Sequence, residues 1–250
     1  MGSLPRKGGV IAVGLCGAAG RMGREIFRAA ALSSDIVIAK AYEAPKHPSL
    51  GAQIGAATIQ ADDALDFLEG CRVLVDFSAP PEALLSHLER AAGKKLAAIV
   101  GATGISTEIR GQMERLASQI PLLYSANMSL GINLLTILAR RVQELLPGAF
   151  DVDIVEMHHR AKRDAPSGTA LMIAQQLQQV SPDQQIHQHS IRAGDVIGEH
   201  TVLFTGVGER LELIHRAASR EAFAQGALAA IRFIAHQKPG FYDMSKVLGI

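Results

Sequence analysis

The first half of the chain alternates between short apolar runs and longer amphipathic segments. Each apolar run predicts a buried strand, and the runs cover residues 10–15, 35–42, 73–77, 96–100 and 120–124. Apolar residues at helical spacing follow the runs, at residues 26–31, 82–92, 106–119 and a long stretch through 146. Strands that alternate with helices predict a parallel, doubly wound sheet. Residues 45–60 lack either pattern, and we expect a loop there.

The pattern changes after Pro147 and Gly148, which end the long helix. Short alternating or apolar segments predict strands at 151–157, 190–192, 200–206 and 209–217. A helix over 168–180 interrupts them, and the chain returns to helix over 219–236. The second half therefore predicts a mixed or antiparallel sheet with a helix on one face, as in a separate substrate domain.

A glycine turn follows the first predicted strand. Gly17, Gly20 and Gly23 form a G-x-x-G-x-x-G pattern that leads into a helix, a spacing variant of the dinucleotide fingerprint. Such a turn also occurs for packing reasons alone. Glu43, however, ends the next strand 20 residues beyond Gly23, where an acid can accept hydrogen bonds from a ribose. Dinucleotide binding is therefore the preferred interpretation.

The segment 156–170, E-M-H-H-R-A-K-R-D-A-P-S-G-T-A, concentrates positive charge. Ser167 is placed to cap a helix whose first turn holds Gly168 and Thr169, and a helix start attracts anions. Two adjacent histidines, with a lysine three residues further on, add proton donors near neutral pH. A solvated surface turn is the alternative interpretation. We expect no metal, because adjacent side chains on an extended segment point in opposite directions and no cysteine lies nearby.

Composition excludes several classes. The net charge of +1 gives no sign of a nucleic-acid partner, and no run reaches the roughly 18 apolar residues of a membrane span. Cys16 and Cys71 lack motif spacing, which fits a reducing compartment, so we expect a cytoplasmic protein. The basic and apolar N-terminus imitates a signal peptide, but its glycines favour a strand and turn. The role of residues 1–8 stays open, with a flexible leader as one possibility.

Together these motifs resemble the 4-hydroxy-tetrahydrodipicolinate reductase (dihydrodipicolinate reductase) family over nearly the whole chain. The block E-x-H-H-R-x-K-x-D-A-P-S-G-T-A is specific to that family, whereas the glycine turn is not. Further similar motifs stand at 75–78, 101–104, 127–129, 192–195 and 198–200.

The resemblance implies a fold and an activity. It implies an α/β protein with an N-terminal Rossmann-like parallel sheet (1–129 and 218–250) and a C-terminal α+β mixed-sheet domain for substrate and oligomerisation (130–217). It also implies reduction of a small cyclic dicarboxylate by NADH or NADPH in diaminopimelate and lysine synthesis. A homotetramer built through the second sheet is a further expectation, with no nucleic-acid or membrane partner.

The resemblance also implies residue roles. His158 is expected to donate the proton, and Lys162 to bind the substrate and assist catalysis. The substrate carboxylates are expected to contact His159, Ser167, Gly168 and Thr169. The cofactor is expected to contact Gly17, Gly20, Arg21, Met22, Glu43, Gly101, Thr103, Ala126 and Met128. Ala44 and Met128 depart from the family pattern. Family members often have a basic residue directly after the ribose-binding acid, where this chain has Ala44, and an aromatic residue at the position of Met128.

Two alternatives stay open from the sequence. Another oxidoreductase of this layout is one; a semialdehyde dehydrogenase would need a nucleophilic cysteine, for which Cys16 and Cys71 are poorly placed. A binding module that senses a dinucleotide without turnover is the other. It would leave His158 and Lys162 without a chemical role.

Overall fold

The computed structural model of the protein describes residues 9–78 and 82–250 and divides into two compact units. The first unit runs up to Ser125 and includes Ala224–Val247, and the second comprises Ala126–Phe223 and Leu248–Ile250. Residues 1–8, whose role the sequence leaves open, lie outside the described residues.

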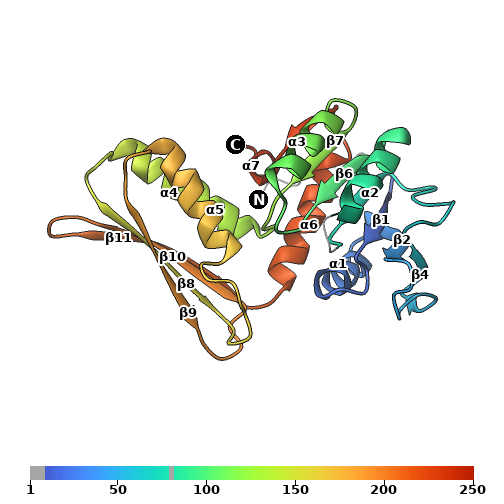
Figure 1. The fold of residues 1–250 in the computed structure, drawn as a ribbon, viewed down its shortest axis with the longest axis horizontal. Coiled ribbons are helices and arrows are strands. Elements are labelled where there is room, and N and C mark those ends of the chain that lie inside the picture. Colours follow the sequence, from blue (N-terminus) through green and yellow to red (C-terminus); the bar gives the residue numbers. More distant parts are fainter. Residues whose placement is uncertain (1–8, 79–81) are drawn as a thin grey trace. The chain divides into compact units, whose positions relative to one another are not determined.

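The first unit is built on a mostly parallel sheet (Figure 1). Its described strands are β1 (Ile11–Cys16), β2 (Ile36–Glu43), β3 (Gln53–Ile54), β4 (Ala57–Ala61), β5 (Val73–Asp76), β6 (Ala97–Val100), β7 (Pro121–Tyr124) and β12 (Gly240–Tyr242). The strand order is β12-β7-β6-β5-β1-β2-β4-β3, and β3 is the antiparallel member. The chain leaves β1 toward β2 on one side and returns to β5 on the other. Ligands of such sheets bind at this reversal, beyond the carboxyl ends of β1 and β5.

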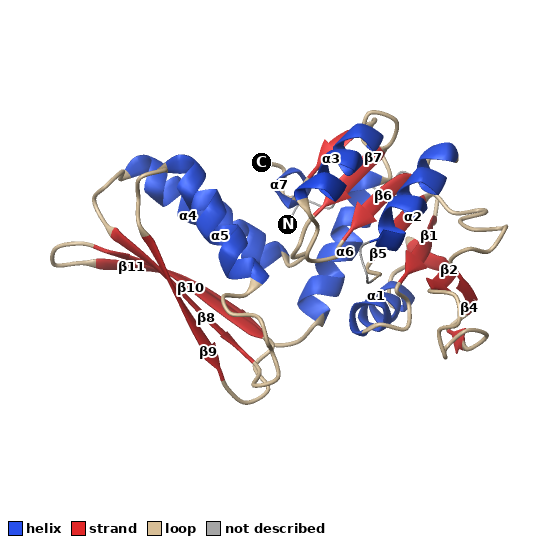
Figure 2. Ribbon diagram, in the orientation of Figure 1, coloured by secondary structure: helices blue, strands red, loops and turns tan. Residues whose placement is uncertain are grey.

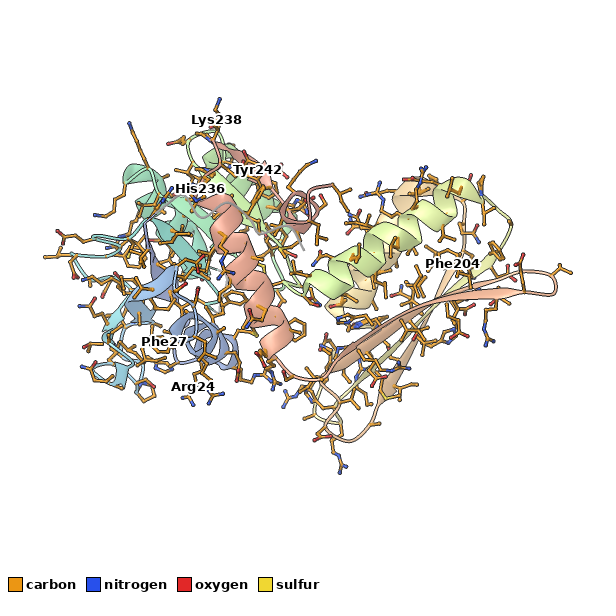
Figure 3. All side chains as sticks on the ribbon, turned by 180° about the vertical axis from the view of Figure 1, so that it is seen from behind. Arg24, Phe27, Phe204, His236, Lys238 and Tyr242 are labelled. Atoms are coloured by element: carbon orange, nitrogen blue, oxygen red, sulfur yellow. The ribbon has the colours of Figure 1, made fainter. Side chains whose placement is uncertain are left out.

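Helices cover both faces of this sheet. They are α1 (Arg21–Ala31), α2 (Glu82–Gly93), α3 (Thr107–Leu116), α6 (Glu221–Ile234) and the short α7 (Met244–Val247). Helices α2 and α3 lie on one face and α1 and α6 on the other (Figures 1 and 3). Buried strands such as β5 and β6 are apolar at every position but Asp76, as expected for strands covered on both faces.

The predicted Rossmann-like sheet is confirmed, but the prediction of a loop over 45–60 is wrong. Strand β3 and most of β4 lie there, and β4 pairs with β2 from Ala41 to Glu43. Strand β3 has only two residues and is held by pairing with β4, while the alternation of β4 is short, with only Ala57 and Ile59 buried.

The second unit is a four-stranded mixed sheet backed by two helices (Figure 2). The strands are β8 (Asp151–His158), β9 (Ile186–Arg192), β10 (Gly198–Thr205) and β11 (Arg210–Ala217), in the order β11-β10-β8-β9. The helices are α4 (Leu130–Leu145) and α5 (Gly168–Val180). Strand β9 begins earlier than the sequence pattern indicated. The pattern missed its first residues because they alternate only weakly between polar and apolar side chains.

The alternation of β8 and β10 determines which residues face the helices. Val152, Ile154, Val202 and Phe204 point into a core shared with α4 and α5, and Figure 3 labels Phe204 between β10 and the helices. Glu156, His158 and His200 continue the same face and are also buried. The face that buries the core therefore carries polar side chains at one end of the sheet. No helix among residues 9–78 and 82–250 is both long enough and apolar enough to cross a membrane.

Candidate active site

The glycine turn connects β1 to α1. Gly17 adopts a φ of +74°, a conformation that favours glycine, and Gly20 is the N-cap residue of α1. A Cβ on Gly23 would lie 2.2 Å from the carbonyl oxygen of Gly17, so helix and turn pack backbone to backbone. Arg21 and Met22 occupy the first turn of α1, with Arg21 exposed. The N-terminus of α1 is therefore open to an anion.

Glu43 lies at the end of β2, next to this turn. Its Oε1 accepts a hydrogen bond of 2.7 Å from the backbone N–H of Ala19. The predicted acid and the predicted glycine turn thus lie together. The carboxylate also has a second oxygen that can accept a ribose hydroxyl.

The loop after β6 holds the next predicted cofactor residues. Gly101 is buried, and a Cβ there would lie 2.2 Å from the ring of Phe77. Thr103 is exposed beyond it. The ends of β1, β5 and β6 thus converge at one edge of the sheet, where Gly17 and Gly101 both pack against residue 77.

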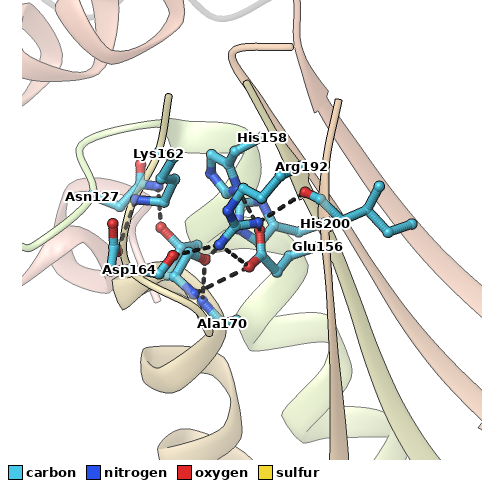
Figure 4. Close-up of polar contacts among 11 residues, drawn as sticks. Asn127, Glu156, His158, Lys162, Asp164, Ala170, Arg192 and His200 are labelled. Carbon is cyan, nitrogen blue, oxygen red and sulfur yellow. Dashed lines mark hydrogen bonds and ion pairs between the residues drawn. The ribbon is translucent and has the colours of Figure 1, made fainter. Parts of the chain in front are cut away.

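A second polar cluster is centred on Glu156 in the second unit (Figure 4). Glu156 has no exposed surface and receives hydrogen bonds from both terminal nitrogens of Arg192, at 3.0 and 2.8 Å. The backbone N–H of Ser167 donates to the same carboxylate, and His158 contacts it through Nδ1. Strand β8, the start of α5 and the end of β9 therefore meet on one buried carboxylate.

These contacts determine the protonation of the pair. Burial opposes the charge of Glu156, but hydrogen bonds from Arg192, Ser190 and His158 outweigh burial and lower its pKa to about 2. Glu156 is therefore ionised near neutral pH, and His158 must donate its Nδ1–H to it. Burial lowers the pKa of His158, with Lys162 and Arg192 contributing, against the opposing effect of Glu156. The Nε2 atom of His158 is then left free for a proton transfer.

Helix α5 begins beside this cluster. Ser167 caps the helix, as predicted, because its side chain accepts a hydrogen bond from the N–H of Ala170. Gly168 and Thr169 occupy the first turn, whose N–H groups have no partner within a helix. Asn127 donates from Nδ2 to Thr169 Oγ1 at 2.9 Å. This bond joins Thr169 to the segment that carries Ala126 and the buried Met128.

Lys162 and His159 lie in the connection between β8 and α5. Lys162 donates to Asp164 at 2.8 Å, and its side chain is 22% exposed. His159 is half-buried, and its carbonyl oxygen accepts a hydrogen bond from the N–H of Lys162. Both side chains are near the surface, where an arriving anion can contact them.

A small cavity of about 70 Å³ lies within the second unit. Its lining residues are Asn127, His158, Thr169, Gly198, His200, His215, Ala217 and Phe223. His158 and Thr169, predicted for catalysis and for substrate binding, thus share one cavity. Lys162, His159, Ser167 and Gly168 do not line it.

Two histidines of this cavity had no predicted role. His200 lies edge-on to His158, with ring centroids 5.2 Å apart, and its Nε2 is 3.3 Å from Ser167 Oγ. Burial lowers the pKa of His200 to about 3, so the ring is neutral. His215 pairs with His200 across the strands and contacts Ser129 Oγ through Nε2. The strand register brings these rings together, and residue spacing alone does not indicate it.

One group of potential metal ligands occurs among the described residues, formed by Cys16, Asp76 and His87 in the first unit. Both ring nitrogens of His87 already contact carboxyl groups, those of Asp76 and Asp62.

The fold places the protein in a class: an oxidoreductase with a Rossmann-like dinucleotide-binding sheet and a second unit built on a mixed sheet. The family model "Dihydrodipicolinate reductase, N-terminus" matches residues 11–128, and "Dihydrodipicolinate reductase, C-terminus" matches residues 131–248. The chain belongs to the dihydrodipicolinate reductase family. The family expected from the sequence is thereby confirmed, and with it a nicotinamide cofactor.

Relatives of known name agree with this assignment. The chain is 42% identical to the 4-hydroxy-tetrahydrodipicolinate reductase of Rubrobacter xylanophilus, over 96% of this chain and 98% of the relative. It is 40% identical to the enzyme of the same name from an Anaeromyxobacter species, over 96% and 98% of the two chains. Among solved structures, a dipicolinate-bound dihydrodipicolinate reductase from a Paenisporosarcina species shares the fold with a TM-score of 0.77. That pair is 22% identical, over 94% of this chain and 97% of the other.

Proposed function

We propose that this chain reduces 4-hydroxy-tetrahydrodipicolinate to tetrahydrodipicolinate in diaminopimelate and lysine synthesis. The observation that carries the proposal is His158, held by an ionised buried carboxylate in a cavity shared with the first turn of α5. One side of this site offers a proton carrier and the other attracts an anion. A cyclic dicarboxylate that must gain a proton meets both requirements.

Once the substrate has lost water, a reduced nicotinamide bound at the glycine turn would supply the hydride for one ring carbon of the resulting conjugated imine. His158 then delivers a proton from Nε2 to the adjacent carbon. Because Nδ1 is fixed on Glu156, protonation at Nε2 gives an imidazolium that the carboxylate stabilises. The approaching substrate carboxylates also favour this charged form.

The substrate carboxylates bind the N-terminus of α5, with Ser167, Gly168 and Thr169 as proposed contacts. Lys162 and His159 hold the exposed side of the substrate. In the structure Lys162 is paired with Asp164, so a substrate carboxylate replaces one anionic partner by another. Such an exchange positions the amine with little loss of charge pairing.

The cofactor binds along the turn at Gly17, Gly20, Arg21 and Met22, with Glu43 on the adenosine ribose. Gly101, Thr103, Ala126 and Met128 contact its nicotinamide end. We propose that NADH is used better than NADPH, because Glu43 would repel a 2′-phosphate and the exposed Ala44 offers no cation to bind it. The variant Ala44→Arg is expected to raise activity with NADPH relative to NADH, and Glu43→Ala to weaken NADH more than substrate.

We also propose a homotetramer built through the face of the second sheet opposite α4 and α5. This face carries exposed apolar side chains, Ile191 at 40% and Ile214 at 44% exposure. Light scattering on the wild type and on Ile214→Glu tests the proposal, since a buried glutamate at an interface would break the assembly. The free buried thiols of Cys16 and Cys71 support a place in the cytoplasm.

The deciding experiment follows NADH oxidation by absorbance while dihydrodipicolinate synthase generates the unstable substrate from pyruvate and aspartate semialdehyde. We expect rapid oxidation that depends on both precursors, and a slower rate with NADPH. NADH binding by calorimetry without any oxidation would contradict the proposal and favour a dinucleotide sensor.

A further inference from the structure

A chain of buried and half-buried polar contacts crosses the first unit near the proposed dinucleotide site. His87, on α2, lies between two carboxyl groups: its Nδ1 is 2.7 Å from Asp76 and its Nε2 is 3.1 Å from Asp62. Asp76 ends β5, and Asp62 follows β4. One side chain therefore connects the ends of two strands that lie on opposite sides of β1.

Each end of this chain of contacts continues to a residue at the cofactor edge. The other oxygen of Asp76 accepts hydrogen bonds from the backbone N–H and hydroxyl of Ser78, at 2.8 and 2.5 Å. At the opposite end, the N–H of Asp62 donates to the carbonyl oxygen of Glu43 at 2.9 Å. The series Glu43, Asp62, His87, Asp76 and Ser78 is thus continuous.

At the Ser78 end of this chain of contacts, residues 77–78 pack against the glycine turn that contains Gly17 and against the loop that contains Gly101. A Cβ on Gly17 would lie 2.8 Å from the carbonyl oxygen of Phe77 and 3.0 Å from the nitrogen of Ser78. A Cβ on Gly101 would lie 2.2 Å from the Phe77 ring. Because Gly17 packs on the backbone of residues 77–78 and Gly101 packs on the Phe77 ring, a shift of residues 77–78 would displace the turn and the loop that the cofactor contacts.

The charges in this region favour a histidine at position 87. His87 is 3% exposed and Asp76 is completely buried. Burial opposes the charge on His87, but hydrogen bonds and charges from Asp76 and Asp62 outweigh burial and raise its pKa. Arg90 adds support by donating to the carbonyl oxygens of Asp62 and Ala64. An imidazolium carries an N–H donor on each ring nitrogen and can donate to both carboxyl groups, which a neutral imidazole cannot do.

We infer that His87 is a positioning residue for the dinucleotide site. Through Asp62 it holds the end of β2 at Glu43, the proposed ribose contact, and through Asp76 it holds the segment at Ser78. His87 itself does not contact the cofactor in this proposal. The inference rests on the proposed function, since it assigns the edge formed by Glu43, Gly17 and Gly101 to NADH.

The test compares three variants of the full chain. His87→Leu removes both donors. His87→Asn keeps a donor near the Nδ1 position, toward Asp76, and His87→Gln keeps one near the Nε2 position, toward Asp62. We expect His87→Leu to raise the KM and the Kd for NADH about tenfold, with the KM for substrate and kcat within about twofold. The two amide variants are expected to show intermediate effects, because each retains one contact.

A matched control separates positioning from general stability. Asp35 precedes β2, at the edge of the sheet opposite the carboxyl ends, and pairs with Arg232 at 2.8 Å. Asp35→Asn is expected to lower the Tm without changing the KM for NADH. Asp62→Asn, a variant of nearly unchanged shape, serves as a further test if His87→Leu does not fold.

The outcomes distinguish the two proposals. Weaker NADH binding in the folded variants of His87 or Asp62, but not in Asp35→Asn, supports the inference. An unchanged KM for NADH in every folded variant, with a Tm lowered as in the control, overturns it while leaving the proposed function intact. A wild-type protein that neither binds nor oxidises NADH overturns both.

Discussion

His158 is hydrogen-bonded through Nδ1 to Glu156, a carboxylate without exposed surface that Arg192 also contacts through two nitrogens. The ionised carboxylate requires a proton on Nδ1 and leaves Nε2 for chemistry. It also supplies a negative charge that stabilises the imidazolium. Glu156 thus orients His158 and raises its proton affinity against the larger opposing effect of burial.

Replacing Glu156 by Gln keeps the size of the side chain and removes its charge. We expect kcat to fall by about 10²-fold, because His158 loses the group that fixes its tautomer and stabilises its charged form. Steady-state kinetics measure this, and Asp153→Asn is the matched control on the same strand. Asp153 points to the opposite face and contacts His189 at 2.6 Å. Similar losses in both variants would mean that Glu156 acts only on the stability of β8.

His158 and Lys162 are predicted to have separable roles. His158→Gln is expected to lower kcat by about 10²-fold with a modest change in the KM for substrate, because it removes the proton donor alone. Lys162→Ala is expected to lower kcat and raise the KM for substrate, because the amine both binds and assists. Arg141→Ala, which removes an exposed cation on α4, controls for loss of positive charge and is expected to leave both constants within about twofold. Near-normal turnover in His158→Gln would remove its proposed role.

His200 is predicted to make the protein sensitive to acid. Its pKa is about 3 in the folded chain because of burial, whereas an unfolded histidine titrates near 6.5. Between these values the unfolded state binds a proton that the folded state does not, so stability falls as the pH is lowered. The contribution approaches about 1.4 kcal/mol per pH unit within this window.

Denaturant unfolding at pH 7, 6 and 5 measures this dependence. We expect a shallower loss of stability in His200→Gln than in the wild type. His189→Gln, which removes a largely exposed histidine from β9, is expected to follow the wild type. Parallel curves for all three proteins would refute the assignment to His200.

The pattern of apolar runs was sufficient to predict the parallel, doubly wound sheet, because buried parallel strands form largely continuous apolar segments in the sequence. Ser167 was predictable as a cap for a similar reason, since its role depends on the three residues that follow it. Strand β3 was not predictable. Its two residues, Gln53 and Ile54, are held by pairing with β4 and have no pattern of their own.

The remaining polar residues of the site could not be located because strand register, which local sequence does not specify, brings them together. His200 lies opposite both Glu156 on β8 and His215 on β11. His87 approaches Asp62 only after α2 has packed on the sheet. A histidine in a helix or strand has many possible partners until the neighbouring strand is known.

Gly23 provides a direct test of the turn that begins the first unit. An added Cβ would lie 2.2 Å from the oxygen of Gly17 and 2.6 Å from that of Ala18, and both are backbone atoms that cannot rotate away. We therefore expect Gly23→Ala to destabilise the protein by about 1–3 kcal/mol, although alanine is the better helix former. Because Gly17 belongs to the turn, the Kd for NADH should also rise.

Gly111→Ala in helix α3 is the matched control for Gly23→Ala. A Cβ at Gly111 meets no atom within 4 Å, so the same substitution should stabilise the protein by about 0.5–1 kcal/mol through helix propensity alone. NADH affinity should not change in this control. Thermal melts and calorimetry of the two variants measure stability and NADH affinity. If Gly23→Ala were as stable as Gly111→Ala and bound NADH normally, the contact between turn and helix would have no part in cofactor binding.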